Sequence, residues 1–410
     1  MATGIGKKRR YEGFRFYLPK DAWIITATSA FWGIGSFMYS PFQSIFFKAL
    51  GMPLVYIALI AAISSVVTAA ALILGGYLAD AYGRRKVIVI FSTISAGSAL
   101  MYVFINSWQI ILIPVIISAL CSIYTPAFNS ILTESMREDM RPTGFASFAM
   151  LNTLPAIFAP FIGGLLMVHY GDINGIKIAF FVSGMLGLVA MFVRAIKLGE
   201  TYKPKQRLKE PFLKHIRDVL NGYAYALKKA NGDAKKLLLY AITSSIAASF
   251  TTIFISLYLV NQLNLSPLTY GLLSGITGIA TVIVLIPTVR IIKRAGLKKA
   301  AILSALFSPL SMFIFVSSNG MNDLLAWSVT GGVGGALAQP SMSTLQGNLS
   351  EKEIRGRLMA LFSVMPLLAA FPAQILSGYL YANVSYLSTF LISIPFYVIS
   401  IFILTRLNIK

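Results

Sequence analysis

Long apolar runs separated by short polar segments dominate the chain. A helix needs about 20 apolar residues to cross a bilayer core of about 30 Å. The pattern predicts twelve such helices, near 22–47, 54–79, 87–106, 109–133, 144–168, 176–197, 237–260, 269–292, 300–318, 324–347, 358–381 and 386–406. Most of them contain Gly, Ser or Thr, which suits close helix packing in lipid. We therefore expect an all-α membrane protein with twelve transmembrane helices.

Composition excludes a soluble protein. Hydrophobic residues make up 57% of the 410 residues and charged residues only 12%, whereas soluble domains have about 45–50% and 25%. The net charge of +21 does not indicate nucleic acid as a partner, because the basic residues lie in short pieces between apolar runs. A nucleic-acid-binding protein gathers them on one polar face.

The basic residues predict the orientation. If the N-terminus is cytoplasmic, all of the 35 Lys and Arg except Lys48 and Lys177 lie on the cytoplasmic side, as the positive-inside rule requires. We expect a multi-pass protein of the plasma membrane with both termini in the cytoplasm. The first apolar run is too long for a cleaved signal peptide. The single cysteine, Cys121, lies in an apolar run and permits no disulfide within the chain.

A polar stretch divides the twelve predicted helices into two groups of six. We expect a cytoplasmic tail over 1–20, a six-helix bundle over 21–197, a cytoplasmic linker over 198–236 and a second bundle over 237–410. Within the linker, apolar residues recur at helical spacing at Phe212, Ile216, Val219, Tyr223 and Leu227. They indicate an amphipathic helix that could lie on the membrane surface, but we interpret it as a solvated linker helix with no binding role.

The two bundles are related by an internal repeat. A shift of 213 or 214 residues places Gly83 on Gly296, Pro126 on Pro340 and Arg141 on Arg355. Two related bundles joined by a long linker are typical of secondary transporters, in which the binding site lies near mid-membrane between the repeats.

A short charged motif, "GGYLADAYGRRK" at 75–86, lies between the second and third predicted helices. Glycine at position 76 lets another helix approach closely, and glycine at position 83 permits a tight turn. The carboxylate of Asp80 could pair with Arg84 or Arg85, or with the positive end of a neighbouring helix.

The motif resembles the loop motif G-x-L-x-D-x-x-G-R-R/K of the major facilitator superfamily (MFS). The matching residues are Gly76, Leu78, Asp80, Gly83, Arg84 and Arg85. The resemblance implies two pseudo-symmetric six-helix bundles and transport by alternating access. It implies that Asp80 contacts the start of span eleven and locks the cytoplasmic gate. A decayed copy near 289–299 has Lys293 in place of the aspartate.

The resemblance also implies that spans one, four, seven and ten line the central cavity. Polar and small residues at helical spacing in these spans favour the same view. We expect the cavity to be lined by Trp32, Ser36, Tyr39, Gln43, Ser122, Asn129, Thr252, Ser256, Gln339 and Ser343. Alternatively, the hydroxyl groups bond back to their own helices and only hold neighbouring helices together.

Embedded charge is absent from the expected cavity, because the 14 acidic residues lie at helix ends or in loops. We therefore expect a small neutral or amphiphilic solute, uncharged or weakly cationic, since intramembrane charges usually mark ion pathways. If transport is coupled to protons, Asp21 and Glu134 are the candidates. The sequence "APFIGG" resembles a motif of MFS exporters, with Pro160 bending the helix and Gly163 and Gly164 permitting close packing. It favours export.

Other classes fit less well. The chain has only two histidines and no cluster of metal ligands or paired nucleophile and base, so we expect no enzyme, no metal and no cofactor. An importer of a sugar or other small metabolite remains an alternative, and so does a transporter-like sensor or scaffold. The expected partners are a small-molecule solute and the lipid bilayer, and the expected assembly is a monomer.

Overall fold

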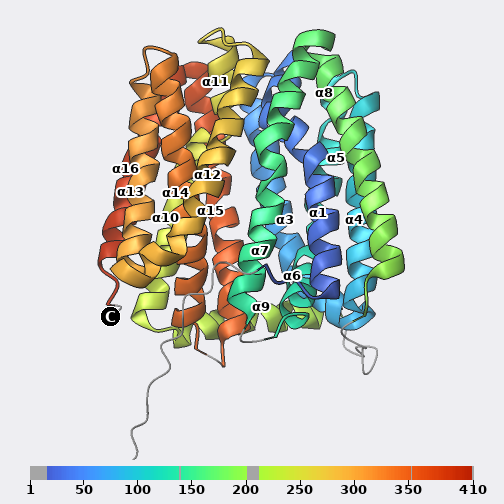
Figure 1. The fold of residues 1–410 in the computed structure, drawn as a ribbon, viewed down its shortest axis with the longest axis vertical. Helices are drawn as coiled ribbons and strands as arrows, with labels where there is room; N and C mark the ends of the chain where they lie inside the picture. The colour runs from blue at the N-terminus through green and yellow to red at the C-terminus, as the bar shows by residue number, and fades with distance from the viewer. Residues whose placement is uncertain (1–15, 138–139, 201–211, 352, 409–410) are drawn as a thin grey trace, which may run out of the picture.

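The computed structural model describes residues 16–137, 140–200, 212–351 and 353–408, which form helices and no strand. Most helices run along the long axis of the molecule (Figure 1). In chain order they are α1 (Lys20–Tyr39), η1 (Ser40–Phe42), α2 (Gln43–Ala49), α3 (Leu54–Tyr82), α4 (Arg84–Met101), η2 (Tyr102–Phe104), η3 (Trp108–Ile110), α5 (Leu112–Cys121), α6 (Tyr124–Glu134), α7 (Arg141–Thr153), α8 (Pro155–Lys197), α9 (Phe212–Lys229), α10 (Gly232–Thr251), α11 (Ile255–Asn261), α12 (Pro267–Ala295), α13 (Leu297–Val316), α14 (Met321–Leu349), α15 (Arg355–Asn383) and α16 (Tyr386–Thr405). We call the end of the molecule where α1 begins and α16 ends the lower end.

The helices account for the twelve predicted spans. Within the described ranges, nine continuous helical stretches are long and apolar enough to cross a membrane. One of them, Thr143–Lys197, covers spans five and six, because the chain reverses at Gly171, whose φ is 80°. The helices α1 and α14, which are richer in polar and small residues, supply spans one and ten.

The internal repeat is visible in the backbone. Gly83 and Gly296, 213 positions apart, have φ/ψ of 92°/142° and 86°/154° and end α3 and α12. Gly51 and Asn264, also 213 positions apart, have φ of 85° and 52°. Positive φ is uncommon for a residue other than glycine, so its recurrence at the same register confirms that the two halves share one backbone plan.

The two halves, α1–α8 and α10–α16, are sealed together at the upper end. One cluster of buried apolar side chains contains residues of both halves, from Phe42 to Phe390. The Phe42 ring meets the Tyr270 ring edge-on at 5.5 Å between centroids. The Ser65 hydroxyl of α3 donates to the Gln374 amide oxygen of α15 at 3.1 Å. Toward the lower end, the clusters of the described residues each belong to one half.

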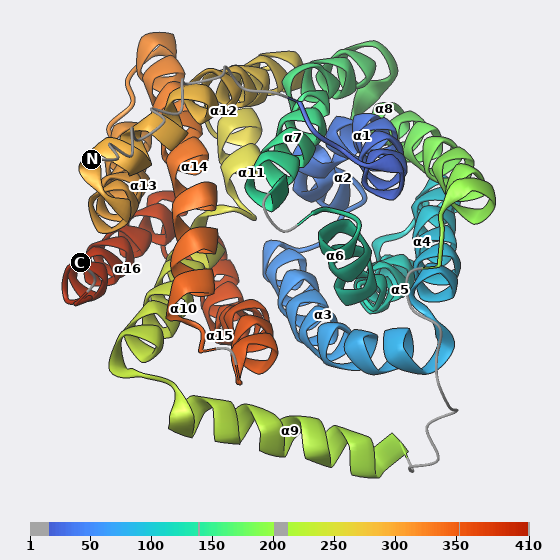
Figure 2. The same cartoon turned by 60° about the horizontal axis from the view of Figure 1, so that its bottom comes forward.

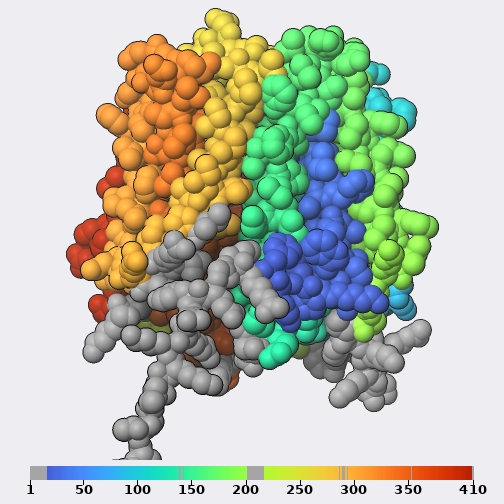
Figure 3. Space-filling model, viewed as in Figure 1, coloured from blue at the N-terminus to red at the C-terminus, as the bar shows by residue number. Residues whose placement is uncertain are grey.

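Glycine residues let the halves approach along α8 and α12. A Cβ atom added to Gly275 would lie 2.6 Å from the carbonyl oxygen of Ile157, and one added to Gly164 would lie 2.6 Å from that of Pro267. Real Cβ contacts are longer than 3.0 Å, so these positions tolerate only glycine while the helices stay in place. Figure 3 shows α12 in direct contact with α7 and α8 on the front face of the molecule.

The linker helix α9 crosses the lower end of the molecule (Figure 2). Its Tyr223 and Leu227 side chains pack on the buried cluster of the C-terminal half. Tyr225 donates a hydrogen bond to Glu353 at 2.9 Å, and Lys229 forms an ion pair with the same carboxylate. At Tyr223 and Leu227 the apolar face is thus covered by protein, and the absence of a binding role for this helix stays a prediction. The side chains of Phe212 and Ile216 and the tail up to residue 15 lie outside the described part.

Candidate solute cavity and gate

Three of the four spans expected to line a cavity are interrupted in mid-course. Span one breaks between α1 and α2, span four between α5 and α6, and span seven between α10 and α11. The breaks fall on residues of the predicted polar stripes: Tyr39 and Gln43, Ser122, and Thr252. The backbone at these breaks stays right-handed helical, with φ/ψ of −57°/−10° at Ser122 and −57°/−37° at Thr252, and tighter hydrogen bonds such as that from the Ser122 N–H to the Ala119 carbonyl replace the regular pattern. The polar stripes predicted from the sequence thus coincide with the breaks in these helices. The breaks themselves were not predicted.

A cavity of about 290 Å³ adjoins the breaks in spans one and four. All of its wall comes from spans one to four of the N-terminal half, and none of the side chains is charged. The lining residues are Trp32, Tyr39, Ser40, Gln43, Ser64, Thr68, Ser95, Ser98, Ala99, Tyr102, Val115, Ser118, Ala119 and Ser122. Four residues predicted from the sequence are among them: Trp32, Tyr39, Gln43 and Ser122.

Several hydroxyl groups of this cavity are free to bind something else. Hydroxyls elsewhere bond back to their own helix, as Thr26 does to the Ala22 carbonyl at 2.6 Å. The described part of the chain provides no such partner for the hydroxyls of Ser64, Thr68, Ser95, Ser118 and Ser122. The indole N–H of Trp32 is buried and also lacks a partner. The alternative that hydroxyl groups only bond back to their own helices therefore does not apply to these five cavity hydroxyls.

The other predicted cavity residues lie outside this wall. Ser36 lies 3.4 Å from the Ser183 hydroxyl, and Thr252 bonds back to the Ala248 carbonyl at 2.8 Å. Ser256 is buried. The remaining three, Asn129, Gln339 and Ser343, are exposed. Their contact with a solute stays a prediction.

The structure adds wall residues from spans two and three, which sequence reasoning passed over. Ser64 and Thr68 are spaced i, i+4 on α3, and Ser95 and Ser98 are spaced i, i+3 on α4. These spacings place each pair on one helical face. The same search for polar stripes, extended to all twelve spans, would have found them.

The charged motif is tied to the end of span six. The Glu200 carboxylate accepts hydrogen bonds from the backbone N–H groups of Arg84 at 3.1 Å and Arg85 at 3.2 Å. These N–H groups lie in the first turn of α4 and have no acceptor within the helix itself, and a negative charge at this helix end is stabilising. Gly83 leaves room for this contact, because an added Cβ would lie 2.8 Å from the Glu200 carboxylate. The tight turn expected at Gly83 is confirmed.

The motif's side chains extend this network. Arg84 forms an ion pair with Glu134 at the end of α6, and the Arg85 guanidinium donates to the carbonyl of Ala195. Asp21 accepts a hydrogen bond from the Gly199 N–H at 3.1 Å. Both predicted coupling residues thus hold lower-end contacts, and their role in proton coupling stays a prediction.

Two further expectations concern the motif's start. Nothing lies within 4 Å of a Cβ added to Gly76, whereas a Cβ added to Gly75 would collide with the Ile123 carbonyl. The close approach expected at position 76 was therefore wrong. The glycine that lets another helix approach is Gly75, whose face of α3 packs against the break in span four. Leu78 packs against a buried cluster of the N-terminal half. Asp80 is exposed, and its contact with span eleven stays a prediction.

The helix-bend motif packs on two neighbours at once. Gly163 faces the carbonyl of Met38 in α1, and Gly164 faces the carbonyl of Pro267 in α12. The close packing expected at both glycines is confirmed. Pro160 lies within α8, and its own carbonyl faces Gly271 of α12. The motif thus connects the N-terminal half to the C-terminal half.

Arg194 corrects the expectation that no charge is embedded. It lies in span six and is 1% exposed. Its guanidinium donates to the hydroxyl of Thr28 at 2.8 Å and to that of Ser29 at 2.6 Å, and it lies 5.5 Å from the Phe128 ring. No described carboxylate pairs with it. The sequence analysis counted Arg194 among the cytoplasmic basic residues because it lies near the end of the span.

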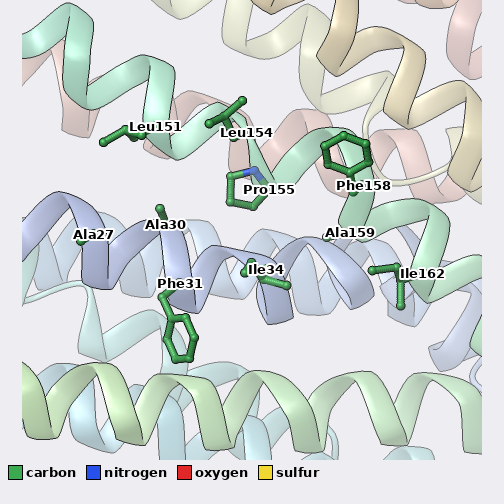
Figure 4. Close-up of a pocket in the computed structure, with 10 residues that line it drawn as sticks. All are labelled: Ala27, Ala30, Phe31, Ile34, Leu151, Leu154, Pro155, Phe158, Ala159 and Ile162. Atoms are coloured by element: carbon green, nitrogen blue, oxygen red, sulfur yellow. The ribbon is translucent and has the colours of Figure 1, made fainter. Parts of the chain in front are cut away.

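A second hollow is entirely apolar. This groove of about 550 Å³ lies between α1 and the α7–α8 junction (Figure 4). Its wall consists of Ala27, Ala30, Phe31, Ile34, Leu151, Leu154, Pro155, Phe158, Ala159 and Ile162. Without a hydrogen-bonding side chain, it cannot orient a polar solute.

Comparisons with known proteins agree with this architecture. A family model described as Major Facilitator Superfamily matches residues 25–235 and 237–408. The uncharacterized MFS-type transporter MJ1560 of Methanocaldococcus jannaschii is 23% identical over 368 residues, 88% of this chain and 92% of that protein. The multidrug resistance protein MdtG of Escherichia coli O9:H4 (strain HS) is 22% identical over 323 residues, 78% of this chain and 76% of that protein.

Solved structures share the fold. The nucleoside transporter NupG superposes with a TM-score of 0.76 over 95% of this chain and all of that chain, at 16% identity. This likeness concerns the fold alone. The family match covers nearly the whole sequence, and the paired helix bundles match it in architecture. The chain therefore belongs to the Major Facilitator Superfamily of membrane transporters.

Proposed function

We propose that the protein moves a small uncharged solute across the cell membrane by alternating access. The observation that carries this proposal is the cavity of the N-terminal half, with free hydroxyls and no charged side chain in its wall. A desolvated charge costs several kcal/mol unless it is paired, whereas a neutral polar solute needs only hydrogen bonds. Arg194 does not change this argument, because its side chain is buried outside the cavity wall.

Alternating access requires a seal that opens and closes. The upper end is sealed by the apolar cluster that joins the halves, and this seal must part in the other state. The charged motif, tied to Glu200 and Glu134, supports a gate at the lower end. The described conformation corresponds to the state with the upper end closed.

Export is the direction that we favour. Two of the exporter-like residues, Pro160 and Gly164, contact α12 of the other half at the closed upper end, and the MdtG protein, to which the chain is similar, is named as a multidrug resistance protein. All Lys and Arg except Lys48 and Lys177 fall in the segments that the sequence predicts to be cytoplasmic, which supports placing both termini in the cytoplasm. We propose that the protein acts as a monomer in the plasma membrane.

Flux measurements test the function. Purified protein in proteoliposomes should give saturable flux of a neutral solute. A flux confined to charged solutes would contradict the proposal. Absence of all flux, together with specific binding, would favour a sensor.

Cysteine labelling tests the orientation. In a Cys121→Ala background, a membrane-impermeant thiol reagent applied outside intact cells should label Asp172→Cys, at the upper turn, and not Thr3→Cys. Labelling of position 3 alone from outside would reverse the proposed topology.

A further inference from the structure

We propose that Ser65 of α3 and Gln374 of α15 form a hydrogen-bond latch that sets how readily the upper end opens. When the latch releases, the Ser65 hydroxyl turns back to a carbonyl of its own helix. This inference rests on the proposed transport by alternating access, in which it gives the two side chains a positioning role. The sequence predicted neither of them.

The latch lies at the lower edge of the upper seal. The helices α3 and α15 lie side by side (Figure 2). Near their upper ends they pack so closely that a Cβ atom added to Gly378 would lie 2.4 Å from the Cβ atom of Ala58. Ser65 lies about two helical turns, or about 10 Å, below Ala58 on α3, and its neighbour Ser64 lines the polar cavity. The hydrogen bond therefore joins the halves where the apolar seal gives way to polar surface.

The Ser65 hydroxyl has two acceptors within reach. It lies 3.1 Å from the amide oxygen of Gln374 and 3.1 Å from the carbonyl oxygen of Ala61 in its own helix. A hydroxyl has one proton, so it bonds to one of these acceptors at a time or is shared between them. When the halves part, the proton turns to the Ala61 carbonyl and Ser65 keeps a hydrogen bond. A buried hydroxyl left without a partner at that moment would cost free energy.

Gln374 makes the latch weak enough to release. In the described part of the chain, the N–H groups of its amide have no acceptor, so Ser65 is the partner that holds this side chain in place. Ordering a long, flexible side chain costs entropy, which offsets part of the stabilisation by the bond. One neutral hydrogen bond therefore shifts the equilibrium between the two conformations by about twofold to tenfold.

The symmetry-related contact between the halves has no such bond. A shift of 213 residues places Ser65 on Gly278 of α12. The same shift places Phe161 of α8 on Gln374. Neither glycine nor phenylalanine has a hydrogen-bonding side chain, and an added Cβ at Gly278 would lie 3.2 Å from the carbonyl oxygen of Ala156. Because α8 and α12 seal by close backbone packing, the repeat does not need a polar pair to pack its halves. The pair between α3 and α15 thus indicates a role beyond packing.

Thiol labelling of the full-length protein from both sides tests the latch. In a Cys121→Ala background, Ser118→Cys places a thiol in the cavity wall. An impermeant reagent is applied from the upper side to intact cells and from the lower side to inside-out vesicles. Ser65→Ala and Gln374→Met should each raise the upper-side rate about twofold to tenfold without raising the lower-side rate. A general loss of packing would raise both rates.

A double variant and a matched control sharpen this test. Ser65→Ala combined with Gln374→Met should label no faster than either single variant, because both changes remove the same bond. The control is Ser363→Ala, a serine of α15 whose hydroxyl bonds to the Met359 carbonyl of its own helix, and it should label at the unaltered rate. Thermal unfolding of each purified variant shows that faster labelling is not loss of folding.

The outcomes separate the latch from the transport proposal. Unchanged upper-side rates in both single variants, a rise on both sides, or effects that multiply in the double variant would each overturn the latch. If one of these results occurs while saturable flux in proteoliposomes persists, the latch fails and the transport proposal stands. If the labelling follows the expected pattern and no solute is moved, the transport proposal fails and the latch belongs to a conformational change without transport.

Discussion

The seal at the upper end depends on glycines of α12, and Gly275→Ala should weaken it. The added Cβ would lie 2.6 Å from the carbonyl oxygen of Ile157, a backbone atom that cannot rotate away, whereas ordinary contact begins at 3.4 Å. The two helices must therefore separate by about 0.8 Å, the difference between these distances. Inserting a methyl group into a packed interface costs about 1–3 kcal/mol.

This cost falls on one conformation only. We expect α8 and α12 to part when the upper end opens, so that the methyl group then meets no carbonyl. Alanine also stabilises a helix by about 0.5–1 kcal/mol relative to glycine, but this gain is the same in both conformations and cancels. A cost of 1–3 kcal/mol in the closed state shifts the equilibrium toward the open state about fivefold to 150-fold, since 1.4 kcal/mol corresponds to a factor of ten.

Labelling from the upper side measures the shift. In a Cys121→Ala background, Ser118→Cys places a thiol in the cavity wall, below the apolar cluster. An impermeant thiol reagent should label it at least fivefold faster in the Gly275→Ala variant. The control is Gly335→Ala, a glycine of α14 with nothing within 4 Å of an added Cβ, which should leave the rate unchanged. Equal rates in all three proteins would refute the role given to the glycine contact.

Three further predictions concern charged residues. Asp80→Asn should lower transport while membrane insertion stays normal, because only a contact that differs between two states can shift their equilibrium; full flux would reduce the motif to a topology anchor. Arg194→Met should keep or raise the unfolding temperature, since a buried cation without a carboxylate partner costs free energy. Thr28→Val should lower the unfolding temperature, because it removes a hydrogen-bond acceptor of that cation. The opposite ranking of the two variants in thermal unfolding would refute this account. The hydrogen bond and charge of Lys229 hold the pKa of Glu353 below its ordinary value. The contacts of Tyr225 and Lys229 with Glu353 should therefore hold α9 at neutral pH and be lost as the pH falls through that lowered pKa. Hydrogen exchange of α9 at neutral and acidic pH checks this, and a Glu353→Gln variant should show no such change.

The linear order of residues determined the membrane class, the spans and the repeat. These features depend on local quantities that a sequence carries directly: the length of an apolar run, the side on which Lys and Arg fall, and the spacing of Gly83 and Gly296. The turn at Gly83 was predictable for the same reason, because a residue's permitted φ depends on its own side chain.

Tertiary structure decided which polar groups meet. Span six brings Glu200 to the start of α4 although 116 residues separate it from Arg84, and nothing local in the sequence records that distance. Arg194 looked like a cytoplasmic residue until its hydrogen bonds to α1 placed it in the protein interior. The cavity wall came from spans two and three as well as one and four. Which face of a helix lines the cavity depends on how that helix packs against its neighbours, and the sequence of one helix does not contain this information.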